Sequence, residues 1–159
     1  RQRQMCIRDR YQIPFVINDN IKVALEVDAD GVHIGQDDMS VEEARKLLGE
    51  DKIIGVSAHN VKEALKAQKG GADYLGVGAV CATSTKKDAN VVSKEEIKKI
   101  KEAVDIPIVA IGGIKKDNID ALTGTGIDGV AVVSAIFGAK DIIKDTKELL
   151  KTVKKMKQK

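Results

Sequence analysis

Short apolar runs alternate along the chain with longer amphipathic stretches. The apolar runs are rich in β-branched residues and nearly continuous, a pattern typical of parallel strands that are covered on both faces. We expect six such strands, at Phe15–Ile17, Gly31–Ile34, Ile53–Val56, Tyr74–Val77, Ile108–Ile111 and Val130–Val133.

Helical patterns fill the gaps between the predicted strands. Ser40 and Ser93 each precede an amphipathic stretch, and a glutamate follows three residues later (Glu43 and Glu96), which is the pattern of a capping box. Gly49 is expected to end the first of these helices. The last helix, at about residues 142–156, is expected to place four apolar side chains on one face: Leu149, Leu150, Val153 and Met156.

A weak internal repeat links three segments, DADGVHIG, GADYLGVG and GIDGVAVVS. In each, a turn of small residues and an aspartate precede a buried strand. Repeated strand–helix units form either an open doubly wound sheet or a β/α barrel. A full barrel has eight units in about 200 or more residues. Six units therefore fit a barrel short by two units or an open six-stranded sheet.

Polar residues gather where the predicted strands end. In a barrel these ends share one mouth, which is where active sites lie. The strand ends carry Asn18-Asp19, Gly35-Gln36 with Asp38, Ser57 with His59, Thr83–Lys86, Gly112-Gly113 and Ser134. This one-sided distribution points to an enzyme site at the carboxyl ends of the strands.

Asp19 and Asp38 follow successive strands, one strand–helix unit apart. Mg²⁺ in proteins is held by one or two carboxylates together with phosphate oxygens. The pair therefore suits a magnesium-bound phosphate or diphosphate. The structural alternative is that Asp19 caps a helix while Asp37 and Asp38 form a turn.

A second group of strand-end residues suits phosphate. Gly113 allows close approach of the backbone to a ligand, and Ser134 can begin a short helix, as in the phosphate sites of many barrels. The alternative for both is a simple tight turn. An earlier glycine-rich strand exit offers two hydroxyls and a cation in a spacing that is not a Walker A loop, namely Thr83, Thr85 and Lys86.

Cysteine and histidine add little chemistry to this picture. Cys6 and Cys81 make neither a disulfide framework nor a metal site, and Cys81 is expected to be a packed thiol rather than a nucleophile. For His33, lining a polar site and simple burial are equally consistent with its place at a strand end. His59 is expected to face solvent at the start of a helix.

Charge changes the picture only at the N-terminus. The chain carries a formal charge of +3, and the first ten residues, RQRQMCIRDR, hold four arginines and one aspartate, which gives the same +3. They lack apolar periodicity and resemble a translated sequencing adapter, with a native basic arm as the alternative. We expect residues 1–10 to be a leader and 11–159 to be a single partial barrel domain. The neutral remainder argues against nucleic-acid binding, and the absence of a long apolar run or a secretory segment predicts a cytoplasmic protein.

Taken together and in order, several motifs resemble the thiamine phosphate synthase family. They are INDN, GVHIGQDD, IIGVSAHN, DYLGVGAVCATSTK, PIVAIGGI and GVAVVSAIF, and they span nearly the whole chain after the leader. The resemblance implies a (β/α)8 TIM barrel, represented here by about six of its eight units. It also implies a magnesium-dependent transferase that joins hydroxymethylpyrimidine diphosphate to thiazole phosphate in thiamine biosynthesis.

The resemblance assigns roles to individual residues. Asp19 and Asp38 would bind Mg²⁺, and Asn18 and Lys86 would contact the diphosphate. Ser57 would contact the pyrimidine, with Ser57 and Lys86 as the catalytic pair. The remaining substrate contacts would be His33 at the pyrimidine and Thr83, Thr85, Gly113, Val133 and Ser134 at the thiazole phosphate.

Two departures from the family pattern stand out. Three prolines of the usual loop are replaced, so that the segment reads Ala79-Val80-Cys81-Ala82-Thr83-Ser84-Thr85-Lys86. The family's first two units, including a strand that grips the diphosphate, have no match. A thiazole tautomerase-like barrel and a catalytically incompetent fragment therefore remain as alternatives. Open sheet edges would favour pairing with a second copy, so a homo-oligomer is also expected.

Overall fold

A computed structural model describes residues 10–81 and 91–156. Its described strands form one parallel sheet whose spatial order is the order of the sequence, β1-β2-β3-β4-β5-β6. The strands are β1 (Val16–Asn18), β2 (Gly31–Ile34), β3 (Ile53–Ala58), β4 (Tyr74–Val77), β5 (Ile108–Ile111) and β6 (Gly129–Ala131). All six predicted strands are present, with small shifts at the ends of three.

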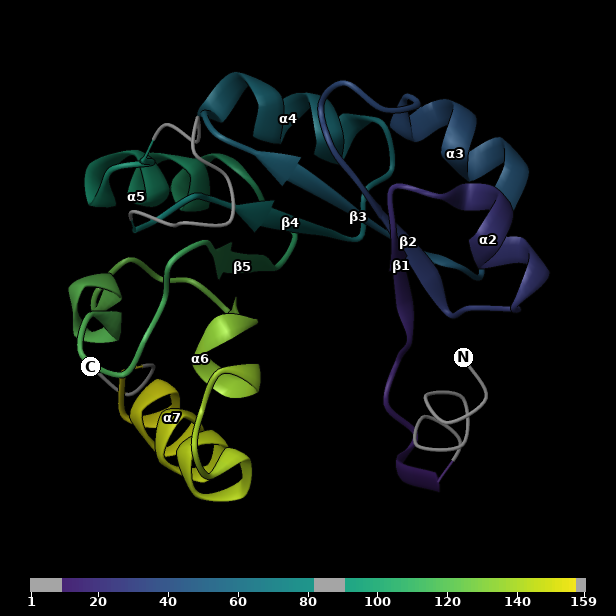
Figure 1. Cartoon of the computed structure of the whole chain (residues 1–159). Helices are drawn as coiled ribbons and strands as arrows, with labels where there is room; N and C mark the ends of the chain where they lie inside the picture. The colour runs from purple at the N-terminus through teal and green to yellow at the C-terminus, as the bar shows by residue number, and fades with distance from the viewer. Residues whose placement is uncertain (1–9, 82–90, 157–159) are drawn as a thin grey trace.

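Helices follow the strands along the chain. They are α2 (Ile21–Glu26), α3 (Val41–Leu48), α4 (Val61–Lys69), α5 (Lys94–Ala103), the 3₁₀ helix η1 (Ile119–Leu122), α6 (Ser134–Phe137) and α7 (Ile142–Met156). Figure 1 shows the sheet curving with α2 to α5 on its outer side. Sequential strand order with helices on the outer side is the arrangement of a β/α barrel, because a doubly wound sheet reverses its strand order and has helices on both faces.

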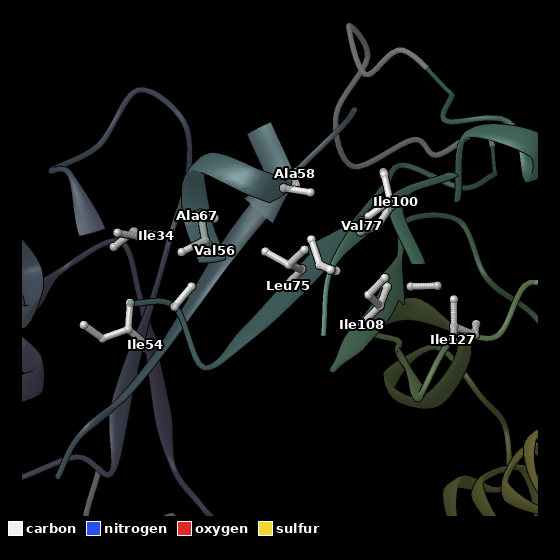
Figure 2. Packing of buried hydrophobic residues seen from close by; sticks show 14 of the residues in the cluster. Ile34, Ile54, Val56, Ala58, Ala67, Leu75, Val77, Ile100, Ile108 and Ile127 are labelled. Carbon is white, nitrogen blue, oxygen red and sulfur yellow. The ribbon is translucent and has the colours of Figure 1, made fainter. Parts of the chain in front are cut away.

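The main core lies between the outer face of the sheet and the helices. Alternate residues of each strand point to this face, where Ile54, Leu75 and Ile108 have no exposed surface. Figure 2 shows these side chains beside Ala67 of α4 and Ile100 of α5. Fully burying a side chain of this size stabilises the fold by about 1.5–3 kcal/mol. Because these apolar residues are buried on the outer face, the alternate residues of each strand lie on the inner face.

The aspartates of the internal repeat explain why the repeat exists. The N–H of each aspartate donates to the carbonyl of a residue on or beside the preceding strand, and its carboxylate accepts from the N–H of that same residue. We call this pair of bonds the aspartate clamp. The clamps join Asp30 to Phe15, Asp73 to Ile54 and Asp128 to Ile108, with carboxylate bonds of 2.6, 2.7 and 2.9 Å and backbone bonds of 2.8 Å in all three.

Arg45 of α3 reinforces the second clamp. Its guanidinium donates to the Asp73 carboxylate at 2.7 Å. It also donates to the backbone carbonyls of Gly49, Lys52 and Gly71 at 3.0, 2.6 and 2.8 Å. One side chain thus ties the end of α3 and the loops before β3 and β4 to the clamp.

The helix termini confirm most of the expected caps. Ser40 and Glu43 form the full capping box, and Gly49 ends α3 with a φ of 77°. Ser93 caps α5, but the Glu96 side chain accepts from Val61 N–H at 3.3 Å, on α4. The prediction of a second capping box was therefore wrong in its glutamate half, because a packed neighbouring helix offered that carboxylate a backbone N–H.

The last helix has the predicted bounds, Ile142–Met156, but a narrower apolar face than expected. Leu149 and Met156 are buried and Val153 packs against the core. Leu150 is 52% exposed, so its prediction as part of the buried face was wrong. It lies one residue, or about 100°, around the helix from Leu149, beyond the stripe that contacts the core.

Replacing Asp73 by alanine should lower the free energy of unfolding by about 1–2 kcal/mol, because it leaves the Ile54 N–H and the Arg45 guanidinium without their carboxylate. Urea unfolding monitored by circular dichroism would measure the change. Asp51→Ala is the matched control, since Asp51 is exposed and its loss should cost no more than about 0.5 kcal/mol. Equal losses in the two variants would contradict a stabilising role for the clamp.

Candidate active site at the carboxyl ends of the strands

The inner face of the sheet, opposite the helices, carries a row of three polar side chains. His33 of β2 lies between Tyr74 of β4 and Ser57 of β3, with Nδ1 3.0 Å from the Tyr74 hydroxyl and Nε2 3.0 Å from Ser57 Oγ. The register explains the grouping, because His33 pairs with Gly55, Gly55 with Tyr74, and Ser57 with Gly76. Paired residues of parallel strands share a face, so all three side chains emerge on the inner side.

Two glycines make room for these rings. A Cβ on Gly76 would lie 2.8 Å from His33 Cε1, and a Cβ on Gly55 would overlap the Tyr74 ring. The phenol therefore rests directly on the backbone of the neighbouring strand β3, and the imidazole reaches across β3 to rest on the backbone of β4. Their ring centroids are 5.5 Å apart and the planes are tilted by 39°. This close seating restricts both rings to narrow ranges of position.

Burial sets the electrostatics of this row. Desolvation lowers the pKa of His33, while the negative charge of Asp19 acts in the opposite direction and raises it. Desolvation also raises the pKa of Tyr74. Both shifts favour neutral side chains near neutral pH, so the row acts through hydrogen bonds rather than through charge.

The end of β1 places one of the predicted carboxylates. Asp19 has a φ of 63°, in the left-handed region that aspartate tolerates better than most residues, and its N–H donates to His33 O at 2.7 Å. The turn allows Asn20, not Asp19, to cap α2 by accepting from Val23 N–H at 3.0 Å. The alternative that Asp19 serves as a helix cap was therefore wrong. Asn18 and Asp19 are both exposed at the strand end.

The end of β2 combines a turn with a second carboxylate. Asp38 Oδ2 accepts from Gly35 N–H at 2.7 Å, so the predicted turn role of Asp38 is real. Gln36 donates to Ser57 O at 2.6 Å and joins this turn to the end of β3. Asp38 is exposed, and a carboxylate has a second oxygen that can bind a ligand.

These two carboxylates fit the chemistry of a magnesium site that is completed by phosphate. Within the described residues, no three His, Cys, Asp or Glu side chains come together as a metal cluster. Mg²⁺ commonly keeps several waters and takes one or two protein carboxylates plus substrate phosphates. Two carboxylates, one from each of two adjacent strand ends, are therefore enough for a Mg²⁺ ion whose other ligands are water and phosphate oxygens.

The ends of β5 and β6 supply backbone groups. Gly112 and Gly113 have φ values of 97° and 66°, in the region that glycine adopts at the lowest cost, and Asn118 Nδ2 donates to Gly113 O at 2.8 Å. The short helix α6 begins at Ser134 as predicted, with Val133 at its N-cap position, and both are exposed. These are the loops expected to contact phosphate.

Other sequence predictions have mixed outcomes. Thr83, Thr85 and Lys86 lie outside the described residues. Cys81 packs against the core, which confirms the packed thiol, and burial together with the charge of Asp117 raises its pKa. His59 is largely exposed and bonds Glu63 at 2.8 Å, as expected for the start of a helix.

Tyr74 is the residue that sequence reasoning missed. It is the first residue of β4, at the amino end of the strand. Candidate residues were sought at the carboxyl ends of the strands, so Tyr74 was not among them. A usable signal was its two-residue spacing from Gly76, which puts both on the inner face. A long aromatic side chain with a polar tip can reach along that face toward the site.

The chain matches known proteins over most of its length. A model of the family described as thiamine monophosphate synthase matches residues 2–136. Thiamine-phosphate synthase of Clostridium tetani is 55% identical over 143 residues, which are 90% of this chain and 68% of that protein. The protein of the same name from Methanobrevibacter smithii is 55% identical over 148 residues, covering 93% and 71%.

Among solved structures, thiamine phosphate pyrophosphorylase from Pyrococcus furiosus is similar to this chain in fold and sequence. It superposes with a TM-score of 0.85 at 48% identity, covering 94% of this chain and 71% of that one. The superposition confirms the prediction that this chain has the strand and helix arrangement of a TIM barrel in part.

Replacing Gly76 by alanine should displace the His33 ring and lower the free energy of unfolding by about 1–3 kcal/mol, the usual cost of overpacking. Urea unfolding would measure it. Gly129→Ala is the control, because Gly129 is also on the inner face but a Cβ there would have its nearest neighbour at 4.0 Å. A Gly129→Ala loss as large as that of Gly76→Ala would show that the space above Gly76 is unimportant.

Proposed function

The chain belongs to the thiamine monophosphate synthase family, and from that premise we propose that its strand ends and inner face hold the two substrates of thiamine phosphate synthesis. The enzyme is a transferase of thiamine biosynthesis that joins hydroxymethylpyrimidine diphosphate to thiazole phosphate and releases diphosphate. The observation that carries the residue assignment is that Asp19 and Asp38 follow the adjacent strands β1 and β2, while His33 of β2 bonds Ser57 of the next strand, β3.

The diphosphate would lie at the ends of β1 and β2. Asp19 and Asp38 would hold Mg²⁺, and Asn18 would donate its amide hydrogens to the diphosphate oxygens. Lys86 would add a positive charge to the leaving group. When bound, Mg²⁺ neutralises negative charge on the diphosphate and so favours its departure. The support is the chemistry of the donor set and the exposure of both carboxylates.

The pyrimidine would lie on the inner face beside Ser57 and His33. Ser57 can donate one hydrogen bond to a ring nitrogen, and His33 holds the Ser57 hydroxyl from behind at 3.0 Å. The half-buried position of both side chains supports a pocket in which a flat heterocycle replaces water.

The thiazole phosphate would lie across the sheet, at the ends of β5 and β6. Gly113 and Ser134 would offer backbone N–H groups, with Val133 flanking them and the hydroxyls of Thr83 and Thr85 completing the contacts. The support is the left-handed glycine turn after β5, which brings bare backbone to the surface. This placement puts the two substrates on opposite sides of the same inner face.

This division of the site suits a reaction that needs no strong base. Loss of diphosphate leaves a cation that the pyrimidine itself stabilises, so the side chains must bind the leaving group and hold the thiazole nitrogen in line. Carboxylates, amides, hydroxyls and one lysine meet those needs. The tautomerase alternative is weakened, because the relatives from C. tetani and M. smithii both carry the synthase name.

No helix among the described residues is long and apolar enough to cross a membrane. We place the reaction in the cytoplasm on a separate ground, namely that both substrates are phosphorylated and charged. Such molecules do not cross a lipid bilayer unaided.

Asp38→Asn should lower the rate of thiamine phosphate formation by two or more powers of ten, because a metal contact worth several kcal/mol is lost. It should also raise the Mg²⁺ concentration needed for half-maximal rate. Both would be measured on this chain and on a hybrid that places two N-terminal strand–helix units of the C. tetani relative before Tyr11. Asp37→Asn is the matched control at the neighbouring exposed position.

The outcomes separate the competing readings. Turnover by the hybrid alone would identify this chain as an incompetent fragment of a synthase. Folded proteins that never turn over in either form would contradict the site assignment. An Asp37→Asn variant as impaired as Asp38→Asn would remove Asp38 from the metal site.

The same chain should self-associate, because in the part of the chain that the structure describes β1 and β6 each pair with one neighbour and apolar side chains lie exposed near both ends of the sheet. These side chains are Tyr11, Ile13, Val133, Phe137 and Ile143, which are 55–78% exposed. Size-exclusion chromatography with light scattering would measure the mass, and we expect a dimer or larger species that the hybrid reduces. A monodisperse monomer at micromolar concentration would contradict this expectation.

A further inference from the structure

His33 makes two hydrogen bonds on the inner face, and which partner donates in each of them determines the role of Tyr74. Tyr74, His33 and Ser57 form one unbranched row, with both ring nitrogens of His33 engaged at 3.0 Å. A neutral imidazole has one N–H and one bare nitrogen. One of its two neighbours must therefore donate to the ring, and the other must accept from it.

Two arrangements satisfy this count. In the first, Tyr74 donates to Nδ1 and the Nε2–H donates to Ser57 Oγ. In the second, Ser57 donates to Nε2 and the Nδ1–H donates to the Tyr74 oxygen. The arrangements differ in the partner of the Ser57 hydroxyl hydrogen. In the first arrangement the Ser57 O–H can donate to a ligand, and in the second it already donates to His33 Nε2.

Acidity favours the first arrangement. A phenol is far more acidic than an aliphatic hydroxyl and is therefore the stronger hydrogen-bond donor of the two. The serine oxygen is correspondingly the better acceptor, so each group takes the role it performs better when Tyr74 donates and Ser57 accepts. The seating of both rings on Gly55 and Gly76 maintains the geometry.

We propose that Tyr74 is a positioning residue that fixes His33 as the Nε2–H tautomer and thereby turns the Ser57 hydroxyl hydrogen toward the ligand on the inner face. The recipient is a heteroaromatic ring nitrogen, which is an acceptor. Naming that ring as the substrate pyrimidine rests on the proposed function. Tyr74 itself acts only through His33.

The test is ¹⁵N NMR of the histidine side chains in the whole labelled chain at about pH 8, where an ordinary histidine with a pKa of about 6.5 is neutral. The chain has two histidines, and His59→Gln identifies the signals of His33. We expect a single tautomer in the wild type, protonated at Nε2. In Tyr74→Phe, which keeps the ring above Gly55, the Nδ1 signal should move toward the protonated value as the second tautomer becomes populated.

Tyr11→Phe is the matched control, since Tyr11 is 64% exposed and should leave the His33 signals unchanged. Circular dichroism would establish that each variant is folded. His33 protonated at Nδ1 in the wild type would overturn the proposal. So would signals of His33 that are identical in Tyr74→Phe and the wild type.

Adding hydroxymethylpyrimidine diphosphate with Mg²⁺ separates this proposal from the proposed function. Binding to the wild type that weakens about tenfold in Tyr74→Phe, the equivalent of one hydrogen bond, would support both. The expected tautomers without any binding, even to the hybrid protein, would contradict the pyrimidine assignment while supporting the role of Tyr74. Equal binding to both proteins would overturn the link from Tyr74 to the ligand.

Discussion

The aspartate clamp is the interaction on which the arrangement of this sheet depends. In a parallel sheet a slip of one residue would turn every side chain to the opposite face. Each clamp fixes the register of two strands at their amino ends through a pair of hydrogen bonds to one residue. The apolar outer face then packs on the helices, and the middle strands β2 to β4 present glycine, histidine, serine and tyrosine on the inner face.

Stability and chemistry consequently occupy different parts of the same strands. The clamps and their basic partners, Arg45 and Lys101, lie where the strands begin. The carboxylates proposed for the metal lie where β1 and β2 end. Tyr74, His33 and Ser57 lie on the inner face, between the amino ends and the carboxyl ends of the strands. The chain spans 68–71% of the relatives compared with it, and among the described residues β1 and β6 form the two edges of the sheet.

Much of this organisation could be read from the sequence, for identifiable reasons. Continuous apolar runs and capping residues predicted all six strands and the bounds of α7, because burial and caps act locally. The aspartate repeat was visible, but its purpose was not, since a bond from Asp73 to Ile54 depends on which strands become neighbours. The predictions for Glu96 and Leu150 were wrong for the same reason. The bond of Glu96 to a neighbouring helix, and the width of the α7 face that contacts the core, both depend on tertiary packing. Tyr74 was missed because its function depends on a histidine 41 residues away.

The glycines beneath the rings affect how the sequence of such a protein can change. Gly55 and Gly76 offer no functional group to a ligand, yet a side chain at either position would meet Tyr74 or His33. The identities at positions 55 and 74, and at 76 and 33, are therefore coupled: a larger residue at the first is admissible only with a smaller one at the second. In a set of related sequences each pair should therefore covary, positions 55 and 74 between the neighbouring strands β3 and β4, and positions 76 and 33 across β3. The glycines would then report the shape of the binding surface although they have no side chain.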